Sequence, residues 1–108
     1  MSTLIDNLEK LLASGKDTAL LRFGLGNAYL EGGDVARAVP HFRRAIELNA
    51  DYSAAWKLLG KALAMSGDVN GAIDTYNTGI AVAERMGDKQ VMKEMQVFLK
   101  RLSRDAPA

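Results

Sequence analysis

The chain has 108 residues, of which 48% are hydrophobic and 25% charged, and its formal net charge is +1. This composition is ordinary for one soluble globular domain, and the charge balance requires no polyanionic partner. Cysteine is absent and histidine occurs once, which excludes disulfides, thiolate metal sites and a cysteine nucleophile. The first residues lack a basic leader and no apolar run could cross a bilayer, so we expect a cytoplasmic protein without a membrane partner.

About six helices are predicted from apolar or small residues that recur with a period of 3.6 residues. They span approximately residues 3–13, 19–31, 35–48, 53–65, 69–85 and 88–103. Glycine ends four of them, because the left-handed residue after a helix is easiest for glycine to adopt. Asp34 and Asp68 follow two of these glycines directly and are expected to be N-caps. β-branched residues never alternate with polar ones for long, so no strand is predicted.

The middle of the chain repeats after 34 residues. Residues 19–52 and 53–86 are identical at eight aligned positions, where about two would follow from ordinary residue frequencies. The identical pairs are Leu25/Leu59, Gly26/Gly60, Ala28/Ala62, Gly33/Gly67, Asp34/Asp68, Val35/Val69, Ala38/Ala72 and Ile46/Ile80. Each unit reads as a pair of helices with a short turn. Such units stack on their sequence neighbours, so the sequence predicts an all-α solenoid.

This pattern resembles the tetratricopeptide repeat, a helix–turn–helix unit of 34 residues. The second unit supplies the family's Trp56, Leu59, Gly60, Leu63, Ala72 and Tyr76, with Gly79 where alanine is usual. The first unit supplies Leu25, Gly26, Tyr29, Ala38, Phe42 and Ala45, with Arg22 at the tryptophan position. The family's repeat-ending proline is absent. After Glu84 nothing stops the helix before Gly87, so we expect that helix to run on by about one turn.

The resemblance implies an α–α superhelix of two helix pairs with a single helix at each end. The expected parts are an N-terminal half-repeat helix (3–14), repeat one (19–52), repeat two (53–86), a C-terminal capping helix (88–103) and a tail (104–108). Phe42 and Tyr76 are expected to fill the space between successive pairs, and Trp56 to be largely buried. Met92, Met95 and Phe98 are expected to belong to the core. Pro40 should bend its helix mildly.

The resemblance also implies a concave face, lined by the first helix of each pair, that binds other proteins. Spacing directs one set of side chains away from the core and into this face. The predicted partner-binding residues are Leu20, Phe23, Asn27, Leu30, Lys57 and Lys61. Their apolar and cationic side chains favour an extended or helical peptide with a hydrophobic anchor and an acidic group. The alternative is that Leu20 and Leu30 pack on neighbouring helices and that the lysines form a solvated face.

Some members of this family bind the C-terminal carboxylate of chaperones through Lys and Asn on the first repeat, Asn on the second, and Lys and Arg on the third. The corresponding positions here hold Phe23, Asn27, Lys61, Val91 and Met95. Only Asn27 agrees, so this specificity is not expected.

No catalytic, metal or cofactor site is predicted. His41 has no ligand partner at metal spacing, the carboxylates are scattered, and no phosphate-binding glycine loop occurs. The C-terminal basic residues lack interleaved aromatics, so no nucleic-acid partner is expected. The sequence therefore predicts a non-catalytic adaptor or scaffold for a protein or peptide partner. The alternative is self-association through the C-terminal helix, and a monomer and a weak homodimer both stay open.

Overall fold

Six α-helices form where the apolar periodicity predicts them, and a glycine with positive φ lies in four of the five connections. The computed structural model describes residues 3–105, and residues 1–2 and 106–108 lie outside its described part. The helices are α1 (Thr3–Ala13), α2 (Ala19–Glu31), α3 (Val35–Leu48), α4 (Ser53–Met65), α5 (Val69–Met86) and α6 (Lys89–Asp105). No strand occurs within residues 3–105. The predicted all-α fold class is confirmed.

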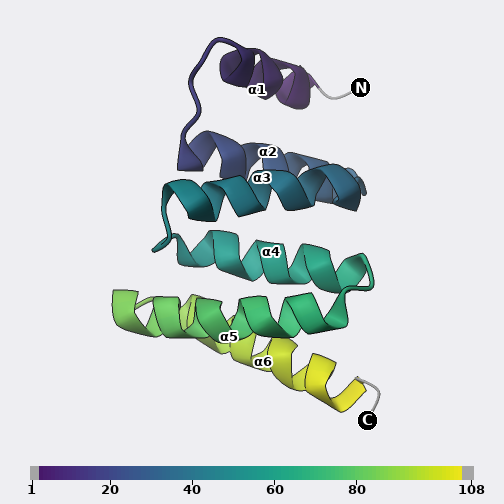
Figure 1. The fold of residues 1–108 in the computed structure, drawn as a ribbon, viewed down its shortest axis with the longest axis vertical. Helices are drawn as coiled ribbons and strands as arrows, with labels where there is room; N and C mark the ends of the chain where they lie inside the picture. The colour runs from purple at the N-terminus through teal and green to yellow at the C-terminus, as the bar shows by residue number, and fades with distance from the viewer. Residues whose placement is uncertain (1–2, 106–108) are drawn as a thin grey trace.

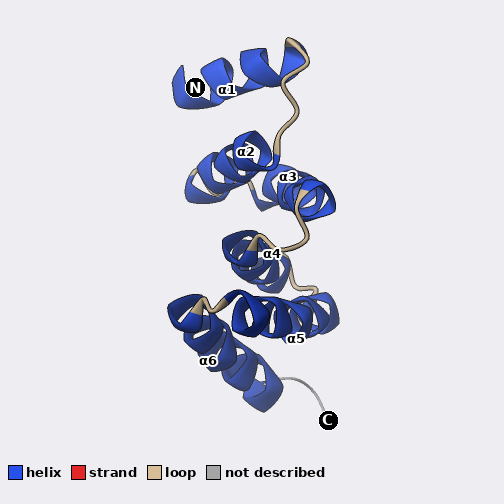
Figure 2. Ribbon diagram, turned by 90° about the vertical axis from the view of Figure 1, so that its left-hand side faces the viewer, coloured by secondary structure: helices blue, strands red, loops and turns tan. Residues whose placement is uncertain are grey.

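The helices stack in chain order, so that sequence neighbours are also neighbours in space (Figure 1). The molecule measures 44 × 28 × 19 Å along its principal axes. α2 packs against α3 and α4 against α5, while α3 packs against α4, and α6 packs against both α5 and α4. Figure 2 shows α2, α4 and α6 on one side of the stack and α3 and α5 on the other. This is a solenoid of two helix pairs with α1 and α6 at its ends.

A glycine in the first helix of each pair lets an aromatic ring from the second helix approach its backbone. A Cβ atom at Gly26 would lie 2.6 Å from Cε1 of Phe42, and one at Gly60 would overlap the ring of Tyr76. Both rings are fully buried. Our expectation that they fill the space between successive pairs was incomplete, because each ring lies first against the glycine of its own pair. Tyr76 also reaches the next helix, where its ring centroid lies 5.9 Å from that of Phe98.

The helix ends follow the sequence signals. The side chains of Asp34 and Asp68 cap α3 and α5 by accepting hydrogen bonds from the backbone N–H groups of Arg37 and Gly71, at 3.2 and 2.9 Å. α5 has 18 residues against 14 in α3, and it ends at Gly87 with φ +77°. The expected extra turn after Glu84 is therefore present. α3 continues through Pro40, which is exposed.

α6 closes the C-terminal end by placing Met95 in the core with no exposed surface. A Cβ atom at Gly79 would lie 2.7 Å from Sδ of Met95 and 2.8 Å from Cβ of Trp56, which explains why glycine replaces the usual alanine. Trp56 packs against the core with an intermediate exposure, in agreement with the expectation that it is largely buried. Its indole Nε1 donates a hydrogen bond to the carbonyl of Ala50, 2.9 Å away.

Two further expectations concern the C-terminal helix, namely its packing against the core and the residue at which it ends. Met92 and Phe98 are partly buried and pack against the core, as expected. α6 ends at Asp105 rather than near Ser103, since its helical pattern has no glycine to stop it. The rest of the predicted tail, residues 106–108, lies outside the described residues.

Candidate partner-binding site

One face of the stack is built from α2, α4 and α6, because α4 contacts both of the other two helices. The beginning of α6 is joined to the beginning of α4 by two polar contacts. Asp88, just before α6, accepts a hydrogen bond from the hydroxyl of Ser53. One to two turns further along, Nζ of Lys57 lies 3.4 Å from Oε1 of Glu94. These contacts fix the first turns of the two helices against each other.

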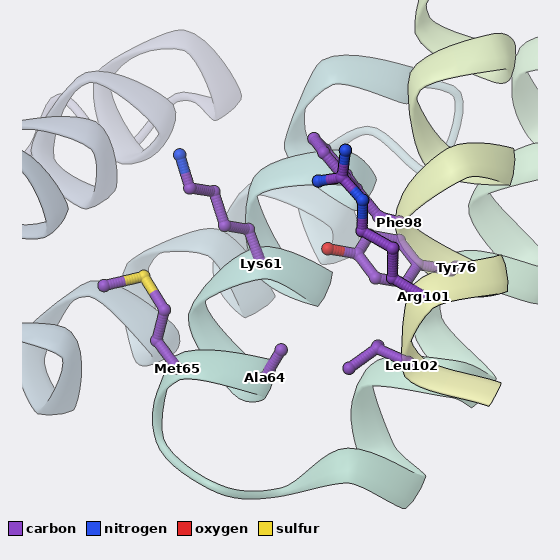
Figure 3. A pocket seen from close by; sticks show the side chains of 7 residues that line it. All are labelled: Lys61, Ala64, Met65, Tyr76, Phe98, Arg101 and Leu102. Carbon is purple, nitrogen blue, oxygen red and sulfur yellow. The ribbon is translucent and has the colours of Figure 1, made fainter. Parts of the chain in front are cut away.

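Beyond these contacts a groove of about 400 Å³ opens between α4 and α6, which we call the α4–α6 groove. Its lining residues are Lys61, Ala64, Met65, Tyr76, Phe98, Arg101 and Leu102 (Figure 3). The groove is apolar apart from the two cations and the hydroxyl of Tyr76. In Figure 3 the side chains of Lys61 and Arg101 extend in the same direction from α4 and α6. Neither cation forms an ion pair with any of the side chains that the structure describes, those of residues 3–104.

Tyr76 links the groove to the core. Its side chain is 1% exposed, and burial raises the pKa of its phenol to about 12. The hydroxyl therefore stays neutral and can donate a hydrogen bond at physiological pH. Figure 3 shows this oxygen directed toward the side on which Lys61 lies. The groove thus offers two cations, one neutral hydroxyl donor and apolar carbon surface.

The predicted binding residues do not form one continuous site. Lys61 is exposed in the α4–α6 groove, but Lys57 is paired with Glu94 and so is not a free cation. Phe23 is partly buried, and its ring stacks on that of Tyr52 with centroids 4.9 Å apart. The expected exposure of Leu30 is wrong. Leu30 is 9% exposed and belongs to the core, because the last turn of α2 is covered by neighbouring helices.

Leu20 and Asn27 lie in a different groove, between α1 and α2, which we call the α1–α2 groove. Its volume is about 470 Å³. Its lining residues are Leu4, Leu8, Thr18, Leu20, Leu21, Gly24, Asn27, Ala28 and Glu31. Leu20 is 72% exposed, and Nδ2 of Asn27 donates to Oε1 of Glu31 at 3.3 Å. The expected surface therefore divides between two ends of the molecule.

A polar cluster fastens α1 to the first helix pair through His41. Nη1 of Arg22 lies 3.2 Å from Nδ1 of His41, and Oε1 of Glu9 lies 3.6 Å from Nε2. The imidazole is parallel to the ring of Tyr29, with centroids 5.6 Å apart, and the Tyr29 hydroxyl donates to Glu9. Burial, together with the Arg22 charge, lowers the pKa of His41. The neutral ring accepts from Arg22 at Nδ1, so Nε2 holds the proton and faces Glu9.

Asp17, in the connection between α1 and α2, extends this cluster. Its carboxylate accepts hydrogen bonds from Arg22 at 2.7 Å and from Arg44 at 3.3 Å. The hydrogen bond from Arg22 is the main reason that the pKa of Asp17 lies below its usual value. Within residues 3–105 no three histidine or acidic side chains are arranged to hold a metal ion. The polar cluster is thus an assembly of ion pairs that supports α1.

The sequence model of a family described as "Tetratricopeptide repeat" matches this chain twice, over residues 5–53 and 23–88. The chain belongs to the tetratricopeptide-repeat family. The first match begins inside α1. Members of the tetratricopeptide-repeat family are generally non-catalytic modules for protein–protein interaction. No helix in the described part of this chain is long and apolar enough to cross a membrane.

Relatives share this repeat arrangement along nearly their whole length. The TPR repeat-containing protein PA0015 of Pseudomonas aeruginosa is 54% identical over 101 residues, which cover 94% of this chain and 96% of that protein. The solution structure of protein BPP2914 from Bordetella parapertussis is 47% identical, with a TM-score of 0.84, and covers 97% of this chain and 91% of that chain. The crystal structure of a tetratricopeptide repeat domain protein from Salinibacter ruber is 28% identical, with a TM-score of 0.74, covering 79% of this chain and 94% of that chain.

Reasoning from the tetratricopeptide repeat alone missed half of the α4–α6 groove. From the sequence, Arg101 belongs to a basic C-terminal edge with no predicted binding role, and Phe98 is expected in the core, with a dimer or partner contact as the alternative. Phe98, Arg101 and Leu102 are spaced at i, i+3 and i+4, which places them on one face of α6. That spacing, combined with the expectation that α6 packs on the last repeat, was the signal that could have found them.

Proposed function

We propose that this protein is a non-catalytic adaptor that binds a peptide segment of another protein in the α4–α6 groove. The observation that supports this most strongly is the presence of two unpaired cations, Lys61 and Arg101, beside an apolar floor. A protein without a ligand gains nothing from holding two like charges next to an apolar depression. A peptide with a carboxylate beside an apolar side chain would satisfy both parts of the groove.

The chemistry of the groove defines the peptide. Arg101 can accept a carboxylate in a bidentate hydrogen-bonded pair, and Lys61 adds a second positive charge. The hydroxyl of Tyr76 can donate a further hydrogen bond. The volume of about 400 Å³ is in the range of ligand pockets and suits one large apolar side chain next to the acidic group. We further propose that the peptide continues from this groove across α4 toward Phe23 of α2.

Selection from a library of random displayed peptides tests this function. Selected peptides are expected to contain an acidic residue adjacent to a large apolar residue. Lys61→Glu with Arg101→Glu should weaken binding of a selected peptide by at least about tenfold, since each charged hydrogen bond contributes about 1.5–3 kcal/mol. Lys100→Glu is the matched control, because Lys100 is an exposed cation on α6 that does not line the groove. Equal losses for both variants would show that only overall charge matters and would refute the site.

Self-association through α6 is a weaker proposal. Met95 is fully buried and Phe98 packs on Tyr76, so these side chains already have partners within the fold. Val97, at 48% exposed, is the large apolar residue that α6 presents to solvent. A dimer that dissociates with Val97→Asp would favour the α6 proposal.

The cytoplasmic location stays a prediction from the sequence.

A further inference from the structure

The N-terminal end of the stack holds three of the seven large hydrophobic side chains that are exposed in the described part of the chain. Leu4 is 57% exposed, Leu11 is 42% exposed and Leu20 is 72% exposed. Leu4 and Leu20 lie on opposite sides of the α1–α2 groove, and the partly buried Leu8 and Leu21 lie in it. Soluble proteins rarely leave such a continuous patch uncovered.

The repeat explains why this end is open. Leu4 and Leu8 stand 34 residues before Ala38 and Phe42, which are completely buried. Phe42 is buried because it packs on Gly26 of the helix that precedes α3. α1 has no such preceding helix among the described residues. The α1–α2 groove therefore lies where the first helix of a further repeat would pack.

The C-terminal end of a second copy cannot cover this groove. In α6, the positions equivalent to Leu59, Gly60 and Ala62 hold Lys93, Glu94 and Gln96. Where the repeat presents leucine, glycine and alanine to its partner helix, α6 presents long polar side chains. At the equivalent Gly60, even a Cβ atom would overlap the ring that packs on it. The longer side chain of Glu94 would therefore prevent such packing. Packing of α6 of one copy on the N-terminal end of another copy is therefore disfavoured.

The N-terminal end of a second copy matches this groove in apolar character and in charge. Thr18 lines one end of the groove, and the exposed Lys16 lies two residues before it; Glu31 lines the other end. A two-fold axis across the middle of the groove would exchange its two ends. Lys16 of one copy would then face Glu31 of the other, and Leu20 of each copy would enter the other groove.

We propose that this protein forms a two-fold homodimer in which the α1–α2 grooves of two copies cover each other. Figure 1 shows α4 and α6 toward the opposite end of the stack from α1, so both copies keep the α4–α6 groove free. The dimer would present two peptide sites to one partner or to two partners, which raises apparent affinity for a partner with two acceptor segments. The dimer does not depend on the peptide specificity proposed above.

Sedimentation equilibrium of the full chain, from about 5 to 500 µM, tests this proposal at concentrations suited to a small interface. The native protein should dimerise with a dissociation constant of about 10–100 µM. Leu20→Asp should raise that constant at least about 30-fold, because it places a charge on the apolar side chain that is most exposed at this interface. Val97→Asp is the matched control and should leave it unchanged, and helical circular dichroism should show that both variants fold.

Charge exchange tests the orientation. Lys16→Glu and Glu31→Lys should each weaken the dimer only about threefold, because an exposed ion pair is weak, and the double variant should restore it, because the pair re-forms with its charges exchanged. A native protein that stays monomeric up to about 500 µM would overturn the dimer. So would a dimer that dissociates with Val97→Asp but not with Leu20→Asp. Failure of the double variant to recover would overturn the two-fold arrangement.

Discussion

Replacing Gly60 by alanine tests how the helix pairs are held together. The added Cβ would lie 2.6 Å from Cδ1 and 2.8 Å from Cζ of Tyr76. The ring cannot move away freely, since it is 1% exposed and Phe98 lies on its other side. Overpacking a core costs about 1–3 kcal/mol, and the confined ring places this site near the upper value. Alanine regains about 1 kcal/mol of helix propensity, so we expect a net loss of about 2 kcal/mol.

Gly24→Ala provides the matched control within the neighbouring helix pair. Its added Cβ would meet only Cδ1 of Leu8, at an ordinary contact distance of 3.8 Å. Only the helix-propensity gain remains, so this variant should stabilise the protein by about 0.5–1 kcal/mol. Urea unfolding, followed by circular dichroism at low protein concentration, measures both free energies of unfolding. Equal stabilities for the two variants, or a Gly60→Ala protein more stable than the native one, would refute the packing argument.

Three further predictions rest on single residues. Gly79→Ala, which restores the residue usual in the family, should destabilise the protein by about 1–2 kcal/mol in urea, because the new methyl group would overlap Met95. Trp56→Ala should cost about 2–3 kcal/mol in the same assay, less than for a fully buried tryptophan, since the indole is only partly buried. Burial lowers the pKa of His41, so the unfolded chain binds this proton more tightly and the stability falls as the pH drops below 6.5. His41→Gln should flatten that slope, and identical slopes for both proteins would contradict the reasoning.

The fold could be predicted from the sequence because the same local pattern occurs in both repeats. Gly26 and Gly60 fall at the same position of two units, and each meets an aromatic residue sixteen positions later. The extra turn of α5 followed from the absence of a stop before Gly87. These features depend on residues close in sequence, for which spacing gives direct information.

The binding surface could be read only in part, because its details depend on contacts between distant residues. Lys57 pairs with Glu94, which is 37 residues away and lies outside the repeated region. At the 34-residue spacing Arg101 corresponds to the turn residues Gly33 and Gly67, so an alignment of the units could not place it beside Lys61. Leu30 is buried in the core, whereas its counterpart in the second unit, Ala64, lines the α4–α6 groove. Equivalent positions thus have different surroundings at the two ends of a short solenoid.

The central claim is that the α4–α6 groove binds a peptide with an acidic and an apolar group. Nuclear magnetic resonance of the isotope-labelled protein, titrated with a peptide selected as above, tests it most directly. The account predicts that the largest chemical-shift changes occur at Lys61, Tyr76, Phe98 and Arg101, and that Lys61→Glu with Arg101→Glu abolishes them. Changes concentrated instead around Leu4 and Leu20 would contradict the claim, because they would place the peptide in the α1–α2 groove.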